Sequence, residues 1–128
     1  MPNGVDGTAP LIAIVDDDER VQAAVSKLIN LAGYRSVVFE SGLVFLQYDL
    51  KHEIRCLILD MDMPGLSGVD LLCRLREMSY AIPTIIVTRH DRELREVALQ
   101  LGALAVLAKT SSGEALLKAV ESAVQSTR

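Results

Sequence analysis

Several polar residues interrupt the apolar segments of this sequence at the points where strands are expected to end. Asp16 and Asp17 follow the apolar run at 11–15, Asp60 ends the run at 56–59, Thr88 ends the segment at 83–87, and Lys109 comes just after 104–107. Short apolar runs bounded by turn signals are typical of strands buried on both faces of a parallel sheet. Because open parallel sheets bind ligands at the carboxyl edge of their strands, these side chains predict one shared site.

The three carboxylates of this predicted site, Asp16, Asp17 and Asp60, would repel one another strongly in a common crevice. An ionised carboxylate at the end of a core strand also costs free energy unless a cation or hydrogen-bond donors meet it. A hard divalent cation such as Mg²⁺ prefers oxygen ligands and keeps some of its waters, so it is the expected cofactor. Lys109 and Thr88 would suit the oxygens of a phosphoryl group on the opposite side. With a metal alongside, the set predicts in-line phosphoryl transfer to a carboxylate.

Each residue also has a simpler structural interpretation when it is taken alone. The acidic pair could begin a helix, where carboxylates interact well with the helix dipole. Thr88 could form a local hydrogen bond at a strand end, and Lys109 could be a solvated surface charge. Their joint placement at four strand ends on one edge favours the functional interpretation. The isolated histidines, His52 and His90, are expected at the surface, although His90 is near the predicted site and could have a modest effect on dephosphorylation.

Strand and helix patterns alternate five times along the chain. Strands are expected at 11–15, 35–39, 56–60, 83–88 and 104–107. One helix is expected after the acidic run at 16–19, with Gly33 as its stop. Others are expected from Ser41, from a capping box at 67–70, from a cap at Asp91 to Gly102, and from a cap at Ser111. The pattern predicts an α/β fold in which helices cover both faces of a five-stranded parallel sheet, in the flavodoxin-like order 2-1-3-4-5. Residues 1–10 are expected to form a flexible lead-in and 11–126 a single domain.

Length and composition limit the possible classes of function. The 128 residues are half hydrophobic and 23% charged, as expected for one globular domain with a proper core. The net charge of −4 argues against direct nucleic-acid binding. Neither a membrane span nor a secretory leader is visible, so we expect no membrane association. Cys56 and Cys73 fit small core residues in a reducing compartment, which indicates a cytoplasmic protein.

The chain resembles a response-regulator receiver domain, the phosphoacceptor module of bacterial two-component signalling, over roughly residues 10 to 125. The matching segments are Val15-Asp16-Asp17-Asp18, Leu59-Asp60-Met61-Asp62-Met63-Pro64-Gly65-Leu66-Ser67-Gly68, Val87-Thr88 and Lys109. Phe39-Glu40-Ser41-Gly42 and the Ala-Ile-Pro before the fourth strand are most similar to receivers that precede LuxR-type helix-turn-helix domains. The resemblance implies a CheY-like (βα)5 three-layer fold and transcription regulation through an output domain.

The resemblance also implies a phosphoacceptor and a metal site. Asp60 would take a phosphoryl group from the phosphohistidine of a sensor histidine kinase. Asp17, Asp60 and the backbone carbonyl of Asp62 would hold Mg²⁺, with Asp16 bound mainly through water. Such a protein is not an enzyme in the usual sense, because it catalyses only its own phosphorylation and hydrolysis.

The rest of the site carries the implied switch, and here the sequence departs from the family pattern. Lys109 would pair with the carboxylate and then with the phosphoryl group. Thr88 would turn its hydroxyl toward the phosphoryl group and report it to the face built from the fourth helix, fifth strand and fifth helix, which could also form a homodimer. Thr110 replaces the usual proline after the lysine, so the loop could run differently and move Lys109. Val106 replaces an aromatic switch residue, and Arg89 could either cover the phosphoryl group or point outward.

Two other functions are consistent with parts of the sequence. Thr110 and Val106 would also fit a scaffold module that keeps the fold but responds weakly to phosphate. Asp60-Met61-Asp62 matches the nucleophile motif of haloacid-dehalogenase-type phosphatases, although in those enzymes the acidic metal-binding pair follows the nucleophile and here it precedes it. A stand-alone receiver and one half of a longer transcription factor would have the same sequence over this range.

Overall fold

The computed structural model of the protein describes residues 7–63 and 68–126. Its elements in chain order are β1 (Leu11–Val15), α1 (Glu19–Leu31), β2 (Arg35–Phe39), α2 (Gly42–Leu46), the 3-10 helix η2 (Lys51–Glu53), β3 (Ile54–Asp60), α3 (Gly68–Glu77), β4 (Thr84–Thr88), α4 (Asp91–Gln100), β5 (Ala105–Ala108) and α5 (Gly113–Ser126). All neighbouring strands are parallel, in the order β2-β1-β3-β4-β5. The predicted fold class and strand order are confirmed.

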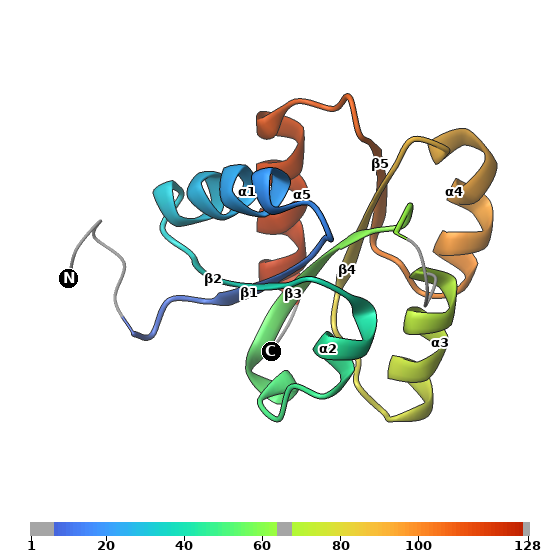
Figure 1. Ribbon diagram of the computed structural model, residues 1–128, viewed down its shortest axis with the longest axis horizontal. Helices are drawn as coiled ribbons and strands as arrows, with labels where there is room; N and C mark the ends of the chain where they lie inside the picture. The colour runs from blue at the N-terminus through green and yellow to red at the C-terminus, as the bar shows by residue number, and fades with distance from the viewer. Residues whose placement is uncertain (1–6, 64–67, 127–128) are drawn as a thin grey trace.

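Two layers of helices enclose the sheet, with α1 and α5 on one face and α2, α3 and α4 on the other (Figure 1). Alternate residues of β3 enter the two halves of the core. Cys56 and Ile58 pack in the half that contains Ile29 of α1 and Val120 of α5. Leu57 and Leu59 pack in the other half, with buried side chains from α2, α3 and α4. The unbroken apolar runs in the sequence therefore reflect strands that are covered on both faces.

Side-chain caps define several helix starts. Asp18 is the N-cap of α1, and its carboxylate accepts a hydrogen bond from the amide of Arg20 at 2.9 Å. Ser41 caps α2 through a 3.1 Å hydrogen bond from the amide of Val44. Gly33 has a φ of 97° just after α1, a conformation that favours glycine and ends the helix where the sequence predicted.

Two predicted caps are wrong by one residue. Asp91 is the first residue of α4 rather than its cap, because the carbonyl of His90 already accepts the first helical hydrogen bond, from Leu94. At α5 the cap is Ser112 and not Ser111, since the Ser112 hydroxyl accepts a hydrogen bond from the amide of Ala115 at 3.1 Å. The Ser67 of the predicted capping box lies outside the described residues.

The register of the sheet brings the ends of the strands together at one edge. Val15 of β1 pairs with Leu59 of β3. The residues that follow them, Asp16 and Asp60, therefore lie beside each other. Asp60 pairs with Val87, and Thr88 pairs with Ala108, the residue before Lys109. The polar residues chosen from the sequence therefore meet at the carboxyl edge of the sheet. Within residues 7–63 and 68–126, none of the helices has both the length and the apolar character of a membrane span.

Candidate functional site

An acidic cluster forms the first part of the site. One carboxylate oxygen from each of Asp16, Asp17 and Asp60 lies within 4.8 Å of the other two. Asp16 and Asp60 are buried, whereas Asp17 is exposed, so the cluster opens to solvent on one side. Three carboxylate oxygens at this spacing are the hard oxygen donors that Mg²⁺ prefers, with room for waters on the open side. The donor set therefore fits the metal that the sequence predicted.

The ionised form of Asp16 is disfavoured in this cluster. Burial raises the pKa of Asp16, and the neighbouring charges of Asp60 and Asp17 raise it further. The amide of Asp18, which donates to Asp16 Oδ1 at 2.9 Å, and the charge of Lys109 oppose that rise without cancelling it. The ionised cluster is thus electrostatically unfavourable in the protein alone, and a bound divalent cation would relieve the repulsion.

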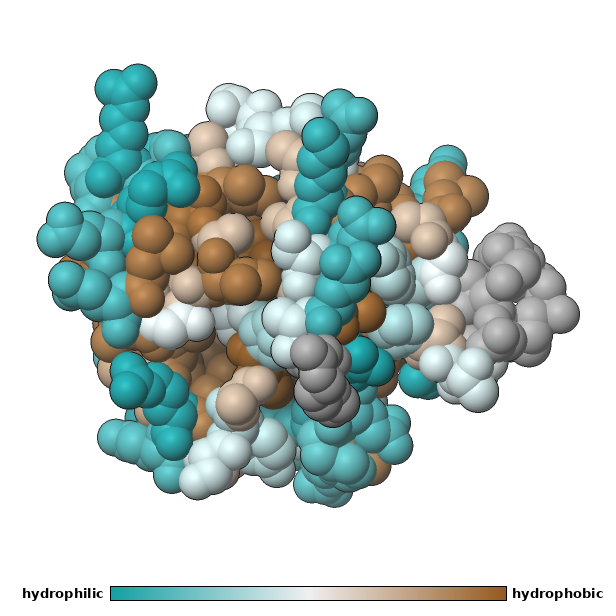
Figure 2. All heavy atoms as spheres, turned by 180° about the vertical axis from the view of Figure 1, so that it is seen from behind, coloured by the Kyte–Doolittle hydropathy of each residue, from teal (hydrophilic) through white to brown (hydrophobic). Residues whose placement is uncertain are grey.

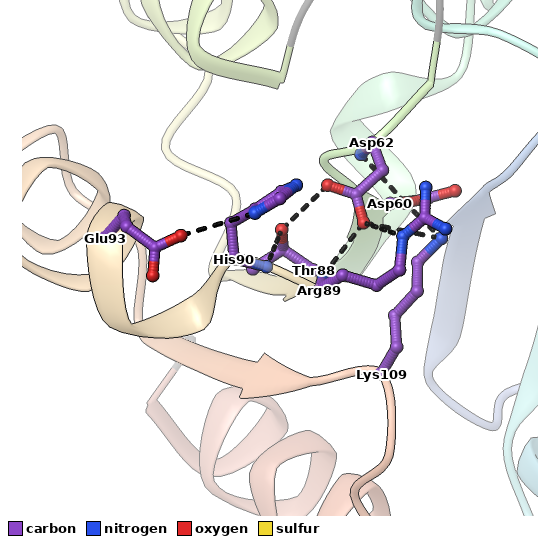
Figure 3. A network of polar contacts seen from close by, with 7 residues as sticks. All are labelled: Asp60, Asp62, Thr88, Arg89, His90, Glu93 and Lys109. Atoms are coloured by element: carbon purple, nitrogen blue, oxygen red, sulfur yellow. Dashed lines mark hydrogen bonds and ion pairs between the residues drawn. The ribbon is translucent and has the colours of Figure 1, made fainter.

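Lys109 supplies the cation that faces Asp60. Its Nζ lies 3.1 Å from Oδ1 of Asp60 and 3.6 Å from Oδ2 of Asp62 (Figure 3). Burial alone would lower the pKa of Lys109, but the hydrogen bond to Asp60 and the charges of three carboxylates raise it overall. The replacement of proline by Thr110 does not take Lys109 away from the site, and no cis peptide bond occurs among the described residues.

Thr88 and the side chain of Asp62 form a second polar group beside the cluster. The Thr88 hydroxyl, which is fully buried, donates to Oδ1 of Asp62 at 2.8 Å and accepts from the amide of His90 at 3.0 Å. The amide of Arg89 donates to Oδ2 of Asp62 at 2.8 Å. Although burial opposes ionisation, these hydrogen bonds and the charges of Lys109 and Arg89 lower the pKa of Asp62. This carboxylate is therefore a strongly bound internal anion.

Arg89 lies across the Asp62 side of the site. Its Nε is 3.6 Å from Oδ2 of Asp62, the same oxygen that Lys109 Nζ approaches to 3.6 Å (Figure 3). The side chain is 71% exposed, so it covers the carboxylate from the solvent side and does not enter the core. The next residue, His90, has its ring 3.3 Å from a carboxylate oxygen of the exposed Glu93, which agrees with the predicted surface position.

The structure places every predicted site residue at this edge and adds one side chain that the sequence analysis missed. Asp62 was selected only for its backbone carbonyl, yet its carboxylate contacts Thr88, Arg89 and Lys109. A signal was present, because the Asp60-Met61-Asp62 spacing places two carboxylates two residues apart at a strand end. Val106, at the predicted switch position, is buried and packs in the core half that faces α2, α3 and α4.

Comparison with known families decides what kind of domain carries this site. The model of the response regulator receiver domain matches residues 12–121, which is most of the chain. The chain belongs to the response regulator receiver domain family. Receiver domains are signalling domains, and the family match favours this interpretation of Asp60-Met61-Asp62 over the dehalogenase one.

Individual response regulators support the same assignment. The response regulator protein TodT of Pseudomonas putida is 36% identical over 118 residues, which are 91% of this chain and 52% of TodT. The transcriptional regulatory protein FixJ of Bradyrhizobium diazoefficiens is 31% identical over 115 residues, which are 89% of this chain and 56% of FixJ. The structure of the response regulator StyR superposes with a TM-score of 0.85 at 34% identity, covering 92% of this chain and 60% of StyR. The chain therefore spans about half the length of the curated relatives that it matches.

Proposed function

We propose that this receiver accepts a phosphoryl group on Asp60 from the phosphohistidine of a sensor histidine kinase. The observation that carries the proposal is that Asp60 belongs to the acidic cluster and also contacts Lys109, whose Nζ is 3.1 Å from its Oδ1. Asp60 is the carboxylate of the cluster that ends the central strand, and Lys109 would meet the negative charge of the incoming group. We propose residues 11–126 as the domain that carries this activity.

The transfer is a displacement at phosphorus. An oxygen of the ionised Asp60 attacks the phosphorus atom, the bond from phosphorus to the imidazole nitrogen breaks, and the departing histidine takes up a proton from water. Lys109 would stay paired with the negative charge that develops on the phosphoryl oxygens. Because its ammonium already faces Asp60, the side chain would not have to move during the transfer. Hydrolysis later returns Asp60 to a carboxylate when a water attacks phosphorus and inorganic phosphate leaves. No other turnover is proposed for this domain.

We propose that Mg²⁺ is the cofactor of this reaction. Asp17, Asp60 and the backbone carbonyl of Asp62 would hold it, with Asp16 contributing mainly through water. When bound, the ion neutralises charge on the phosphoryl oxygens and on the carboxylates. The support is the donor set, since three carboxylate oxygens within 4.8 Å of one another match the preference of this cation.

The test is intact mass spectrometry after incubation with acetyl phosphate, with and without Mg²⁺. The wild type and an Asp49→Asn control should each gain one phosphoryl group only with the metal, and Asp60→Asn should gain none. Asp49 is an exposed aspartate before β3, at the opposite end of that strand from Asp60, so its variant makes the same charge change away from the site. A gain on Asp60→Asn equal to that of the wild type would contradict the proposal. If only a phosphorylated histidine kinase serves as the donor, the same three proteins answer the question with that donor.

We further propose that phosphorylation acts on the surface formed by α4, β5 and α5, which could pair two copies of the domain. Viewed from behind, the molecule has an apolar area beside hydrophilic side chains on the side where α4 and β5 lie (Figure 2). Val97 of α4 is 46% exposed and Leu104, just before β5, is 40% exposed. A mass measurement by light scattering, with Leu104→Glu as the disrupting variant, tests this pairing.

The relatives suggest where such a signal leads. Because the chain spans about half of TodT and FixJ, we propose that an output domain of the LuxR type regulates transcription in the full protein. We also propose that the receiver itself contacts neither nucleic acid, given its net charge of −4, nor membrane. We propose that the phosphoryl transfer takes place in the cytoplasm, where free thiols such as those of Cys56 and Cys73 stay reduced.

A further inference from the structure

We propose that the Asp62 carboxylate occupies the phosphoryl-binding donors of the unphosphorylated receiver and must release them when Asp60 becomes phosphorylated. This inference rests on the proposed function of Asp60. It assigns to the Asp62 side chain a positioning role that is separate from the metal-binding role proposed for its backbone carbonyl.

The Asp62 carboxylate is held as a bound anion would be. Each of its oxygens accepts one short hydrogen bond, from the Thr88 hydroxyl and from the Arg89 amide, both at 2.8 Å. Two cations flank it, Lys109 Nζ and Arg89 Nε, each 3.6 Å from Oδ2. The side chain is only 8% exposed. Charge-assisted hydrogen bonds of this kind are stronger than neutral ones, so the carboxylate is firmly placed.

One of these groups, Lys109, also contacts Asp60. Lys109 Nζ is 3.1 Å from Oδ1 of Asp60, and the Asp62 amide donates to that same oxygen at 2.9 Å. A hydroxyl and a backbone amide have one proton each to donate. While Asp62 accepts both protons, the Thr88 hydroxyl and the Arg89 amide cannot donate to a phosphoryl group. When Asp60 is phosphorylated, either the phosphoryl group displaces the Asp62 carboxylate from these two donors, or the phosphoryl group is bound without them.

The position of Thr88 supports exchange at Asp62 over movement of Thr88. The hydroxyl is fully buried, and the His90 amide donates to it from the other side at 3.0 Å. Thr88 is thus already turned into the site before any phosphoryl group is present. The group left to move is the Asp62 carboxylate, together with Arg89, whose exposed side chain contacts it from solvent. The receiver would then report phosphorylation through the release of Asp62 and Arg89.

Beryllofluoride, a mimic of the phosphoryl group, separates this role from a purely structural one. Asp62→Ala removes the competing anion, and Asp62→Asn keeps the shape but removes the charge and leaves one acceptor oxygen in place of two. Fluorine NMR at saturating Mg²⁺ gives the affinity of beryllofluoride for each protein. We expect binding about tenfold tighter for Asp62→Ala, a smaller gain for Asp62→Asn, and no change for the Asp49→Asn control.

The metal-free proteins supply a second readout that needs no ligand. The amide proton of Arg89 should lose its hydrogen-bonded chemical shift in Asp62→Ala, and the Asp49→Asn spectrum should match the wild type there. An unchanged Arg89 amide, or equal or weaker beryllofluoride binding by Asp62→Ala, overturns the inference and leaves the proposed function standing. A complete lack of beryllofluoride binding by all the folded proteins, wild type included, overturns the proposed function and the inference together.

Discussion

The hydroxyl of Thr88 donates to Oδ1 of Asp62 at 2.8 Å, so the end of β4 already binds an anion in the unphosphorylated domain. Thr88 is fully buried, and the Arg89 amide binds the second oxygen of the same carboxylate. This contact joins the end of β3 to the end of β4 through side chains, beyond the pairing of the strands themselves. Its strength and its consequences can be tested residue by residue.

Two replacements of Thr88 should separate the contribution of its hydroxyl to stability from the contribution of its side-chain volume. Thr88→Val keeps the volume but leaves Asp62 Oδ1 and the His90 amide without this partner, which should lower the free energy of unfolding by about 1–3 kcal/mol. Thr88→Ser restores the hydroxyl and should recover most of that loss. Urea denaturation measures both values. Equal stability of Thr88→Val and the wild type would show that the hydrogen bond to Asp62 is unimportant.

Lys109 should promote phosphorylation without promoting metal binding. Lys109→Met removes the cation 3.1 Å from Asp60, and we expect the rate of phosphorylation by acetyl phosphate to fall about 100-fold. The affinity for Mg²⁺ should stay the same or rise, because the carboxylates lose a competing positive charge. Lys118→Met, at an exposed position on α5, is the matched control. A marked loss of Mg²⁺ affinity in Lys109→Met would contradict this electrostatic account.

Neutralising Asp16 should stabilise the metal-free domain. Asp16→Asn removes a buried charge that is repelled by Asp60 and Asp17, while its side-chain oxygen can still accept from the Asp18 amide. We expect a gain of about 1 kcal/mol without metal and weaker Mg²⁺ binding. Asp17→Asn, at an exposed position, should lose Mg²⁺ affinity with little gain in stability. Thermal unfolding and calorimetric titration give the two quantities, and a less stable metal-free Asp16→Asn would count against the repulsion.

Lys51 should matter for stability and not for phosphorylation. Its side chain is buried, and its ammonium donates to the carbonyls of Leu46 and Tyr48 and lies 5.5 Å from the centre of the Tyr80 ring. Lys51→Met leaves those carbonyls without this donor, so the free energy of unfolding should drop by about 1–3 kcal/mol. Lys27→Met, at an exposed position on α1, should change it little. If Lys51→Met unfolds at the same urea concentration as the wild type, the buried ammonium contributes nothing.

Cys56 should reduce the stability of the domain at alkaline pH. Burial raises the pKa of this thiol from 9.0 to about 12, so the folded state holds its proton at a pH where the unfolded state has lost it. Stability is therefore complete below pH 9 and falls as the pH rises toward 12, by at most about 1.4 kcal/mol per pH unit from this group. Cys56→Ala should show a shallower decline in urea unfolding between these values. Parallel curves for the two proteins would rule out the effect.

Much of the site could be predicted because it depends on local pattern. Asp60 and Lys109 each follow an apolar run, and the ends of parallel strands share one edge of a sheet, so their proximity required no knowledge of side-chain contacts. The direction of the Asp62 side chain could not be predicted in this way. It depends on the register between β3 and β4, in which Asp60 pairs with Val87, and that long-range pairing cannot be read from either segment alone.

The remaining errors have similar physical causes. Ser111 and Ser112 both offer a hydroxyl, and only the path of the chain after β5 decides which one meets the amide of Ala115. The burial of Lys51 against Tyr80 could not be predicted either, because it depends on how the 3-10 helix η2 packs against the segment that follows α3. Sequence patterns identified which edge of the fold carries the chemistry, and tertiary packing determined which atoms face one another there.

The central claim is that Asp60 itself carries the phosphoryl group. Reduction of the phosphorylated protein with borohydride converts an aspartyl phosphate to homoserine, which tandem mass spectrometry can locate in a peptide. We predict homoserine at position 60, formed only when both Mg²⁺ and the phosphodonor are present, and absent from Asp60→Asn. Homoserine at position 16, 17 or 62 in the wild type, with Asp60 unmodified, would contradict the account.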